Sequence, residues 1–389
     1  MPHRPGVVRP IVAALACVLL ASPILAGQEA NVSRKLNGRQ RLELRRLTAM
    51  VERVEANDQP GGDAWLKWSD HFLKASDGKT YIPFTLWIDE APDAFDSVGV
   101  YIKVLTKPDP EADQTLTSDD LTSAGIGQNP VNVAERQFAG SGVPTAGEAA
   151  ANLAMLESSL NINERQRPPF EDVHFVETSR VEGSDVKYVR RAMAVAPGIY
   201  DLYVSVREYL DERGAPEPGS AVLKQTLIVP DLAGDQLATS SIVLAESVQM
   251  LDAPLSPTQQ LEQPYSLGNV QITPVSDTVF GTNEELSLVF LAYNMASVDG
   301  MPDVVVRYRF YLLGVEERLV SAGQPLTINA EALPPGFDLE AVGRQLPVTY
   351  SVPLRSFPVG PYRLEVQVTD NISDTVVNRN VTFIVEDQS

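Results

Sequence analysis

The chain has 389 residues, with 51 acidic against 31 basic side chains and a formal net charge of −20. Such a surplus of negative charge argues against nucleic acid as the partner of the main body, because contacts with phosphates require positive surface. The length is ample for two domains with substantial cores.

The N-terminal 26 residues have the features of a secretory signal peptide. Arg4 and Arg9 precede the uncharged apolar run Ile11–Leu20, and a proline and the small residue Ala26 follow it. The run is shorter than the ~20 residues of a membrane-spanning helix, so we favour removal of the signal over an uncleaved anchor. We therefore predict an exported bacterial protein of the periplasm or the extracellular space.

The only cysteine of the chain, Cys17, lies inside this segment. Cleavage near Ala26 would leave a mature chain without cysteine. Such a chain enters an oxidising compartment without disulfides, so its stability must come from packing.

Residues 27–62 are predicted to form a polar and basic segment with one amphipathic helix, from Arg39 to about Glu55. Apolar residues recur at helical spacing in it, namely Leu44, Leu47, Val51 and Val54. The run Asn57–Gly62 ends the pattern. We expect the apolar stripe to pack on the protein's own sandwich, with a dimer or partner helix as the alternative.

Basic residues gather at the start of this segment: Arg34, Lys35, Arg39, Arg41, Arg45 and Arg46. One interpretation is a grip on an acidic partner or on anionic lipid headgroups, at about 1 kcal/mol per basic residue near a membrane surface. The other is that the stretch rests on the protein's own acidic body or stays solvated. Among possible partner-binding residues we name Arg39, Arg41, Arg45 and Arg46.

Two tryptophans, Trp65 and Trp68, are three residues apart, with His71 and Phe72 close behind. On a helical turn they would share one face and could form an aromatic platform for a sugar or a peptide. Core lining between the helix and the first sheet is the more ordinary role of large aromatic residues. We keep both tryptophans as candidate partner-binding residues.

Strand patterns dominate from residue 63 to residue 246, which we predict to be a first sandwich. Tyr81–Ile88 and Ser97–Leu105 resemble a strand pair, and strand patterns resume at residue 173. Between them, at about 107–170, lies a polar stretch with one Ala-rich helical pattern. A loop of this length inside a compact domain is unusual and is either functional or disordered.

Residues 247–265, rich in proline and glutamine, are predicted to be the linker between two domains. From residue 266 to residue 389 eight short strand patterns follow, separated by turn residues. Many short strands with few helices are typical of an all-β sandwich.

A repeated block supports a duplication of the domain. The pattern Gly-x-Tyr-x-Leu-x-Val-x-Val occurs at Gly198–Val206 and again, 162 residues later, at Gly360–Val368. The alternation suits an antiparallel strand with one face in the core, from which the first copy departs by having Tyr203 and Ser205 on its outer face. The tyrosines, Tyr200 and Tyr362, can bury their rings and return their hydroxyls to nearby backbone.

This block resembles the sixth strand of immunoglobulin-like domains, and in both copies a last strand follows it. Leu202 and Leu364 stand where the disulfide cysteine of an antibody domain would be. The resemblance implies an all-β fold of two tandem immunoglobulin-like antiparallel β-sandwiches behind a short N-terminal helix. It implies no particular function, because this fold has many.

The chain is also similar to uncharacterised exported bacterial proteins, including those with a Gly-Trp-x-Thr-Asp motif. The shared features are the Pro-Gly-x-Tyr blocks and the segment Ser240–Ala245. The Gly-Trp-x-Thr-Asp motif itself is absent, so the resemblance implies a shared architecture and export route only.

No local motif in the sequence points to catalysis. The two histidines outside the predicted signal, His71 and His174, have no metal-ligand spacing, and Gly140-Ser141-Gly142 is not a nucleophile elbow. Phosphate-binding and dinucleotide motifs are absent as well. We therefore expect no metal, no cofactor and no enzymatic activity, and an unidentified protein partner bound by loops, sheet edges or the basic helix.

Two alternatives stay open at this point. A carbohydrate-binding module would use exposed aromatic residues such as Trp65, Trp68 and Trp87. An enzyme would need a pocket in the 107–170 insertion that holds His174 beside an acidic residue. The oligomeric state does not follow from the sequence.

Overall fold

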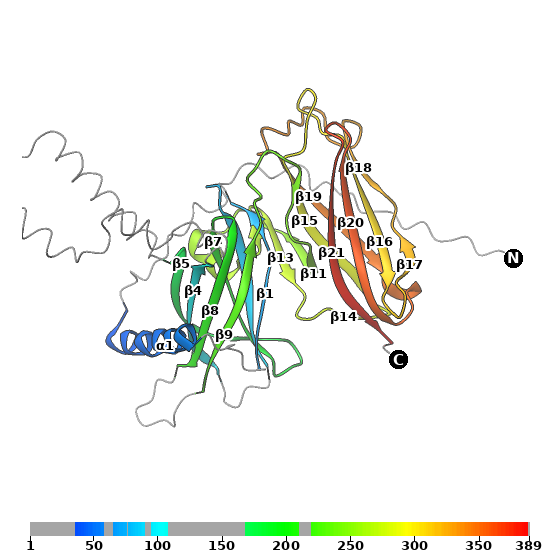
Figure 1. Ribbon diagram of the computed structural model, residues 1–389. Helices are drawn as coiled ribbons and strands as arrows, with labels where there is room; N and C mark the ends of the chain where they lie inside the picture. Colours follow the sequence, from blue (N-terminus) through cyan, green and yellow to red (C-terminus); the bar gives the residue numbers. More distant parts are fainter. Residues whose placement is uncertain are drawn as a thin grey trace, which may run out of the picture.

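The computed structural model describes residues 36–57, 65–75, 77–89, 95–107, 168–209 and 219–387. They form two β-sandwiches side by side, with one helix on the outside of the first (Figure 1). The predicted signal peptide and nearly all of the predicted insertion lie outside the described residues. Within the described ranges, no helix is long and apolar enough to cross a membrane.

The first sandwich pairs a five-stranded sheet A with a four-stranded sheet B. Sheet A contains β1 (Leu66–Asp70), β2 (Leu73–Lys74), β3 (Thr80–Ile88), β6 (Ser179–Arg180) and β7 (Lys187–Val195). Sheet B contains β4 (Ser97–Thr106), β5 (Phe170–Glu177), β8 (Gly198–Glu208) and β9 (Ser220–Val229). The orders β1-β3-β7-β6 and β5-β4-β8-β9 are those of an immunoglobulin-like domain.

Strands β3 and β4, which the sequence predicts to pair, lie in opposite sheets. The chain crosses from sheet A to sheet B between them, so the two strands face each other across the core instead of sharing hydrogen bonds. Their inward residues, such as Phe84 on β3 and Val100 on β4, meet in one apolar cluster. The sequence pattern identifies both strands correctly, but it does not distinguish a neighbour in the same sheet from a neighbour across the core.

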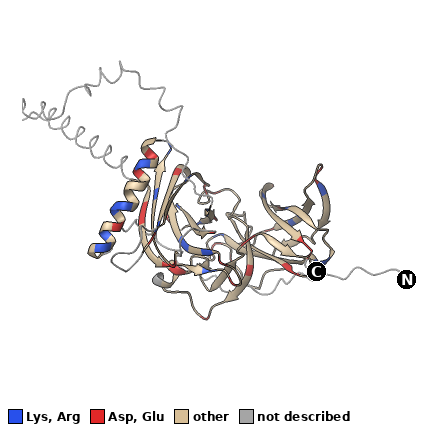
Figure 2. Cartoon of the chain, turned by 90° about the horizontal axis from the view of Figure 1, so that it is seen from below, with Lys and Arg blue, Asp and Glu red and all other residues tan. Residues whose placement is uncertain are grey.

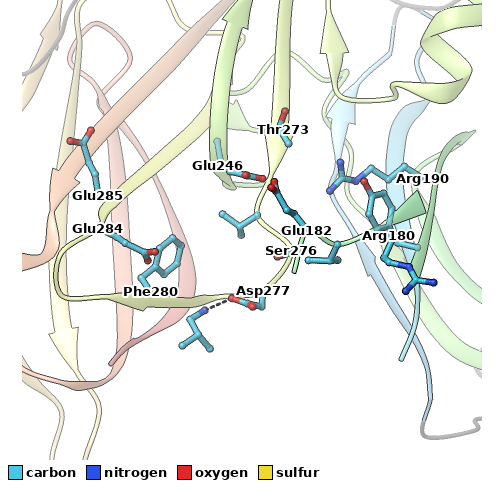
Figure 3. A pocket seen from close by; sticks show the side chains of 15 residues that line it. Arg180, Glu182, Arg190, Glu246, Thr273, Ser276, Asp277, Phe280, Glu284 and Glu285 are labelled. Carbon is cyan, nitrogen blue, oxygen red and sulfur yellow. Dashed lines mark hydrogen bonds between the residues drawn. The ribbon is translucent and has the colours of Figure 1, made fainter. Parts of the chain in front are cut away.

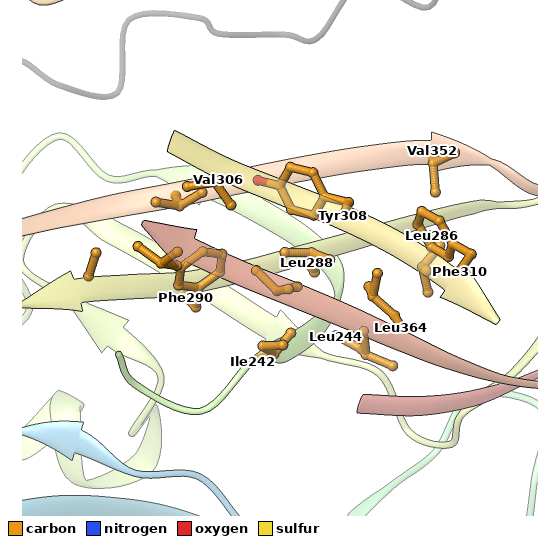
Figure 4. Packing of buried hydrophobic residues seen from close by; sticks show 14 of the residues in the cluster. Ile242, Leu244, Leu286, Leu288, Phe290, Val306, Tyr308, Phe310, Val352 and Leu364 are labelled. Carbon is orange, nitrogen blue, oxygen red and sulfur yellow. The ribbon is translucent and has the colours of Figure 1, made fainter. Parts of the chain in front are cut away.

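The second sandwich is built in the same way from sheets C and D. Sheet C contains β10 (Ala238–Thr239), β11 (Val243–Met250), β12 (Ser266–Leu267), β13 (Val270–Pro274), β15 (Glu285–Tyr293) and β19 (Gln345–Pro353). Sheet D contains β14 (Val279–Gly281), β16 (Val304–Leu312), β17 (Arg318–Ala322), β18 (Leu326–Ile328), β20 (Gly360–Asp370) and β21 (Thr375–Glu386). Its core lies between the two sheets, around Phe290, Phe310 and Leu364 (Figure 4). The predicted tandem of immunoglobulin-like sandwiches is confirmed.

The strand pairing places the boundary between the sandwiches earlier than the sequence predicts. Strand β11 begins in the segment assigned to the first domain, yet it pairs with β13 and β15 of the second. The predicted linker, 247–265, therefore holds the end of β11 and the short helix α5 (Pro257–Glu262). The apolar pattern of β11 identifies a strand, but its sheet is decided by partners that lie between 20 (Met250 with Val270) and 46 (Val243 with Val289) positions further along the chain.

The repeated tyrosines occupy equivalent places in the two sandwiches. Tyr200 on β8 donates its hydroxyl hydrogen bond to Ala196 O at 2.8 Å, and Tyr362 on β20 donates to Pro358 O at 2.7 Å. The glycine that begins each strand has a positive φ, 156° at Gly198 and 141° at Gly360. A Cβ at Gly360 would lie 2.9 Å from a methyl group of Leu312, so the glycine allows the close approach.

Helix α1 (Gly38–Asn57) covers the outer face of sheet B. It begins with a capping box, in which Asn37 Oδ1 accepts from the backbone N–H of Gln40 and Gln40 Oε1 accepts from that of Asn37. Leu47 and Val51 are fully buried against Tyr101 and Tyr203 of the sheet, with the partly buried Leu44 and Val54 around them. The expected packing of the apolar stripe on the protein's own sandwich is confirmed.

Both departures in the first copy of the repeat serve this helix. Tyr203 lies in the apolar cluster beneath α1, and Ser205 donates from Oγ to Leu47 O at 3.0 Å. Next to them, the carboxylate of Glu43 meets Arg207 Nε at 2.7 Å in a buried ion pair that is not aligned as a hydrogen bond. The second sandwich has Glu365 and Gln367 at the matching places, where sheet D faces water.

Ser205→Ala is expected to lower the free energy that holds α1 on sheet B by about 1 kcal/mol, because one buried hydrogen bond is lost. Hydrogen exchange of the α1 amides measures this free energy. The matched control is Gln367→Ala, at the equivalent position of the helix-free sheet D, with an expected change within about 0.5 kcal/mol. Equal effects of Ser205→Ala and Gln367→Ala on hydrogen exchange of α1 would show that the hydrogen bond from Ser205 does not hold the helix.

An apolar seam joins the two sandwiches. Tyr81 on β3 and Leu73 on β2, from the outer face of sheet A, pack against Val289, Leu291 and Tyr293 on the outer face of sheet C. Strands β3 and β15 are consequently buried on both faces, and both sequences are nearly uninterrupted apolar runs.

Polar contacts hold the same seam in register. The backbone of Phe72 and Ser241 exchange two hydrogen bonds, from Ser241 N to Phe72 O and from Phe72 N to Ser241 Oγ. Tyr81 donates from its hydroxyl to Pro264 O at 2.9 Å, and His71 Nδ1 lies 2.8 Å from the hydroxyl of Tyr265. Because these partners come from both sandwiches, the seam fixes their relative position.

Candidate functional site

A cleft of about 780 Å³ lies between the two sandwiches, beside the seam. One wall comes from the first sandwich, at β6, β7 and the turn between them, and the other from β11, β13, β14 and the start of β15. Figure 3 shows its charged and polar lining: Arg180, Glu182, Arg190, Glu246, Thr273, Ser276, Asp277, Glu284 and Glu285. The seam holds both walls, so the cleft is formed before any ligand arrives.

Glu246 is directed into this cleft by a break in strand β11. The pairing register of β11 with β13 shifts between Ala245 and Ser247, which leaves Glu246 as the extra residue of a β-bulge. Figure 3 shows Glu246 among the residues that line the cleft, and Glu182 lines the same cleft from the other wall. Neither side chain has a hydrogen bond or ion pair to another described residue, so both are available to a ligand.

Arg190 provides a positive group on the first-sandwich wall, across the cleft from Glu246. Its guanidinium lies 4.5 Å from the ring centre of Tyr188, and one terminal nitrogen donates weakly to Pro274 O at 3.4 Å. The Nε–H of Arg190 is buried without an acceptor among the described residues. A buried donor in this state costs free energy unless a ligand or water accepts from it.

Other charges of the cleft are partly committed to the fold. Asp277 accepts from Val279 N at 2.9 Å and Glu284 accepts from Gly281 N at 2.7 Å, which shapes the turn before β14 and the one after it. Arg180 pairs with Asp185 at 2.9 Å on an exposed turn. The cleft thus offers carboxylates on both walls and, on the first-sandwich wall, an arginine beside an aromatic ring. This lining suits a chain with basic side chains and backbone carbonyls.

The structure places Trp65 and Trp68 against the core of the first sandwich, away from this cleft. The helical turn considered for them is wrong, since Trp68 lies on strand β1. Trp68 stacks on Phe84 with ring centres 4.1 Å apart and donates from Nε1 to Asp70, and Trp65 contacts Phe95 at 5.0 Å. Both tryptophan rings therefore pack against the core of the first sandwich.

The predicted arginines lie on helix α1, where they appear as blue bands in Figure 2. Arg41, Arg45 and Arg46 are exposed, whereas Arg39 is half-buried over the ring of Tyr209. Arg46 pairs with Glu43 at 3.1 Å, but Arg41 and Arg45 have no ion pair with a described residue. The structure does not bring these arginines together with Trp65 and Trp68.

The charges of α1 run against its macrodipole. Its first turn contains no acidic residue and its last turn no basic one. Arg39 and Arg41 lie at the N-terminal end instead, and Glu55 lies at the C-terminal end. Each like-signed terminal charge is unfavourable by roughly 0.3–1 kcal/mol. Arginines at this end therefore do not serve the stability of the helix itself.

His174 has an acidic neighbour, as the enzyme alternative requires, but it does not line the cleft. His174 Nε2 lies 3.4 Å from Asp172 Oδ2, and both residues are on β5 with the histidine buried. Among the described residues, no group of three or more His, Cys, Asp or Glu side chains is placed to hold a metal ion.

Sheet edges were another predicted means of recognition, and the edge of sheet D formed by most of β21 is protected against pairing. Strand β21 is paired with β14 only at its end, from Ile384 to Glu386. In the middle of the free part Arg379 points inward, opposite the buried Val366, and reaches Thr239 O at 3.4 Å. An inward charge on an edge strand opposes pairing with another strand.

No family model matches this chain, and no match was found among curated proteins. Among solved structures it is similar to a red sea bream transglutaminase, with 10% identity and a TM-score of 0.20 over 87% of this chain and 33% of that one. Alpha-2-macroglobulin of Escherichia coli gives 11% identity and a TM-score of 0.21, over 85% of this chain and 17% of that one. A Salmonella alpha-2-macroglobulin gives 10% and 0.18, over 84% and 17%.

The chain therefore spans a third or less of the length of these proteins, and such scores carry no information on activity or partners. Similarity to exported bacterial proteins with the Gly-Trp-x-Thr-Asp motif stays a prediction.

Proposed function

We propose that this chain is an exported, non-enzymatic binding protein that takes a segment of a protein partner into the cleft between its sandwiches. The observation that carries the proposal is the pre-formed cleft, with Glu246 turned into it by a bulge and the buried Nε–H of Arg190 unsatisfied. A bulge that re-aims a side chain is typical of the neighbourhood of a functional site.

Charge and shape indicate the kind of segment. Basic side chains of the partner would meet Glu182 and Glu246, while its backbone carbonyls or a carboxylate would accept from Arg190. Carbohydrate binding has less support, because the rings of Trp65 and Trp68 pack against Phe95 and Phe84 of the core. An enzymatic site in the insertion has no support from the described residues.

Glu246→Gln is expected to weaken capture of the partner about tenfold, because a carboxylate that meets a basic side chain is lost. The measurement is quantitative affinity capture from the native envelope, with partners identified by mass spectrometry. Glu316→Gln is the matched control, since Glu316 is exposed on the β16–β17 turn of the second sandwich and its substitution removes the same charge. A photo-crosslinking residue at position 246 or 316 then tests direct contact.

Crosslinks from position 246 but not from position 316 would support the cleft. Equal capture by the two glutamine variants would move recognition to another surface. Absence of any specific partner would overturn the binding function as a whole. Deletion of α1 is a poor test, because the helix is packed on sheet B through Leu47 and Val51.

A further inference from the structure

We propose that the N-terminal half of helix α1 docks on an anionic phospholipid surface through an arginine face formed by Arg41, Leu42, Arg45 and Arg46. This inference is independent of the cleft, which lies on other elements of the molecule. It names the binding partner of a strongly basic surface on an acidic chain.

The first argument is the composition of the face. Leu42 is 44% exposed in the midst of the arginines, and helical spacing puts it on the same side as Arg45 and Arg46. The opposite side of α1 is occupied by sheet B through Leu47 and Val51, so the apolar Leu42 does not serve the core. An exposed leucine between arginines can insert among lipid headgroups while the arginines contact the phosphates.

The second argument is the shape and place of the face. Helix α1 lies along the outside of the first sandwich (Figure 2), and the arginine face is exposed on the side away from sheet B. A convex face of this kind fits an extended flat surface better than the folded pocket of a protein. Arg41 and Arg45 form no ion pair with a described residue and can reach headgroups freely.

The third argument is charge complementarity and its direction along the helix. Four of the five arginines of α1 gather in its N-terminal half, while Glu52 and Glu55 lie near the other end, so the helix presents its positive end to a negative surface. Anionic lipid thus explains an arrangement of charge that opposes the helix dipole.

The test is co-sedimentation of the purified protein with vesicles of phosphatidylglycerol and phosphatidylethanolamine, and with vesicles of phosphatidylcholine alone. We expect binding to the anionic vesicles only, weakening as salt is raised. The double variant Arg41→Gln/Arg45→Gln is expected to bind about 25-fold more weakly, at roughly fivefold per arginine. Leu42→Gln is expected to weaken binding at high salt as well.

The matched control is Arg318→Gln/Arg355→Gln, which removes the same charge from exposed positions of the second sandwich. It should stay within about twofold of the original protein, and circular dichroism should be unchanged in all variants. Equal losses in both double variants, or no preference for anionic vesicles, would overturn the proposal. Binding to polyglutamate but not to anionic vesicles would instead assign the face to an acidic polypeptide.

Discussion

Tyr362→Ala is expected to destabilise the second sandwich by about 3–5 kcal/mol, the range for removal of a buried aromatic side chain. Tyr362 is completely buried, stacked on Phe383 with ring centres 5.2 Å apart and edge-on to Phe357 at 5.5 Å. Removal leaves a cavity at the start of β20 and deprives the carbonyl of Pro358 of its hydrogen bond from the hydroxyl. Urea denaturation, with hydrogen exchange to locate the loss, measures the effect.

Two controls separate the ring from the hydroxyl. Tyr362→Phe keeps the ring and should cost about 1 kcal/mol, the value of one hydrogen bond. Tyr200→Ala removes the equivalent residue and should loosen the first sandwich, with hydrogen exchange of β20 unchanged. A loss below about 1 kcal/mol for Tyr362→Ala would mean that the tyrosine does not anchor the strand.

Acidification from pH 6.5 to pH 4 is expected to weaken the seam by about 3 kcal/mol through His71. Burial without a compensating negative partner lowers the pKa of His71 from 6.5 to about 4. The folded protein keeps the imidazole neutral in this window, whereas the unfolded chain binds the proton. The contribution of the neutral His71 to the free energy of unfolding is therefore complete above pH 6.5 and is lost as the pH falls to about 4.

Nearby groups must be separated from this effect. Burial raises the pKa of Asp70, the residue before His71, so protonation of Asp70 favours the folded state at low pH and acts in the opposite sense. Burial lowers the pKa of Lys74, which titrates only on the alkaline side. Asp70 and Lys74 are present in every variant. Their effects on the free energy of unfolding therefore cancel when two variants are compared.

Urea denaturation across this pH range compares the original protein with His71→Asn, which cannot titrate, and with Tyr265→Phe. His71→Asn should remove about 3 kcal/mol of the pH-dependent loss, whatever its effect at neutral pH. Tyr265→Phe deletes the hydroxyl beside His71 Nδ1 but leaves the imidazole buried, so it should keep the pH dependence. Parallel curves for the original protein and His71→Asn would show that the histidine is not the titrating group.

Local patterns account for what the sequence predicted correctly. The helical spacing of Leu44, Leu47, Val51 and Val54 is complete within α1, and the two tyrosine strands carry their glycine, ring and alternation within eleven residues each. Such features need no knowledge of the rest of the chain. The ends of α1 are accordingly predicted to within about two residues.

The seam and the cleft depend on distant partners, and the sequence did not predict them. His71 meets Tyr265 across 194 positions of the chain, and Glu182 and Glu246 line one cleft only because the two sandwiches pack together. Two signals were nevertheless present. The uninterrupted apolar runs of β3 and β15 predict burial on both faces, and Tyr203 and Ser205 mark the place where α1 docks.

The inward position of Arg379 also affects how copies of the protein associate with one another. If a neighbouring molecule paired its own strand with β21, the new strand would cover Arg379. The guanidinium of Arg379 already reaches Thr239 O of sheet C. Growth of an extended intermolecular sheet is thereby penalised at its first step. We therefore expect that fibres of this protein, at any concentration, do not grow through its last strand.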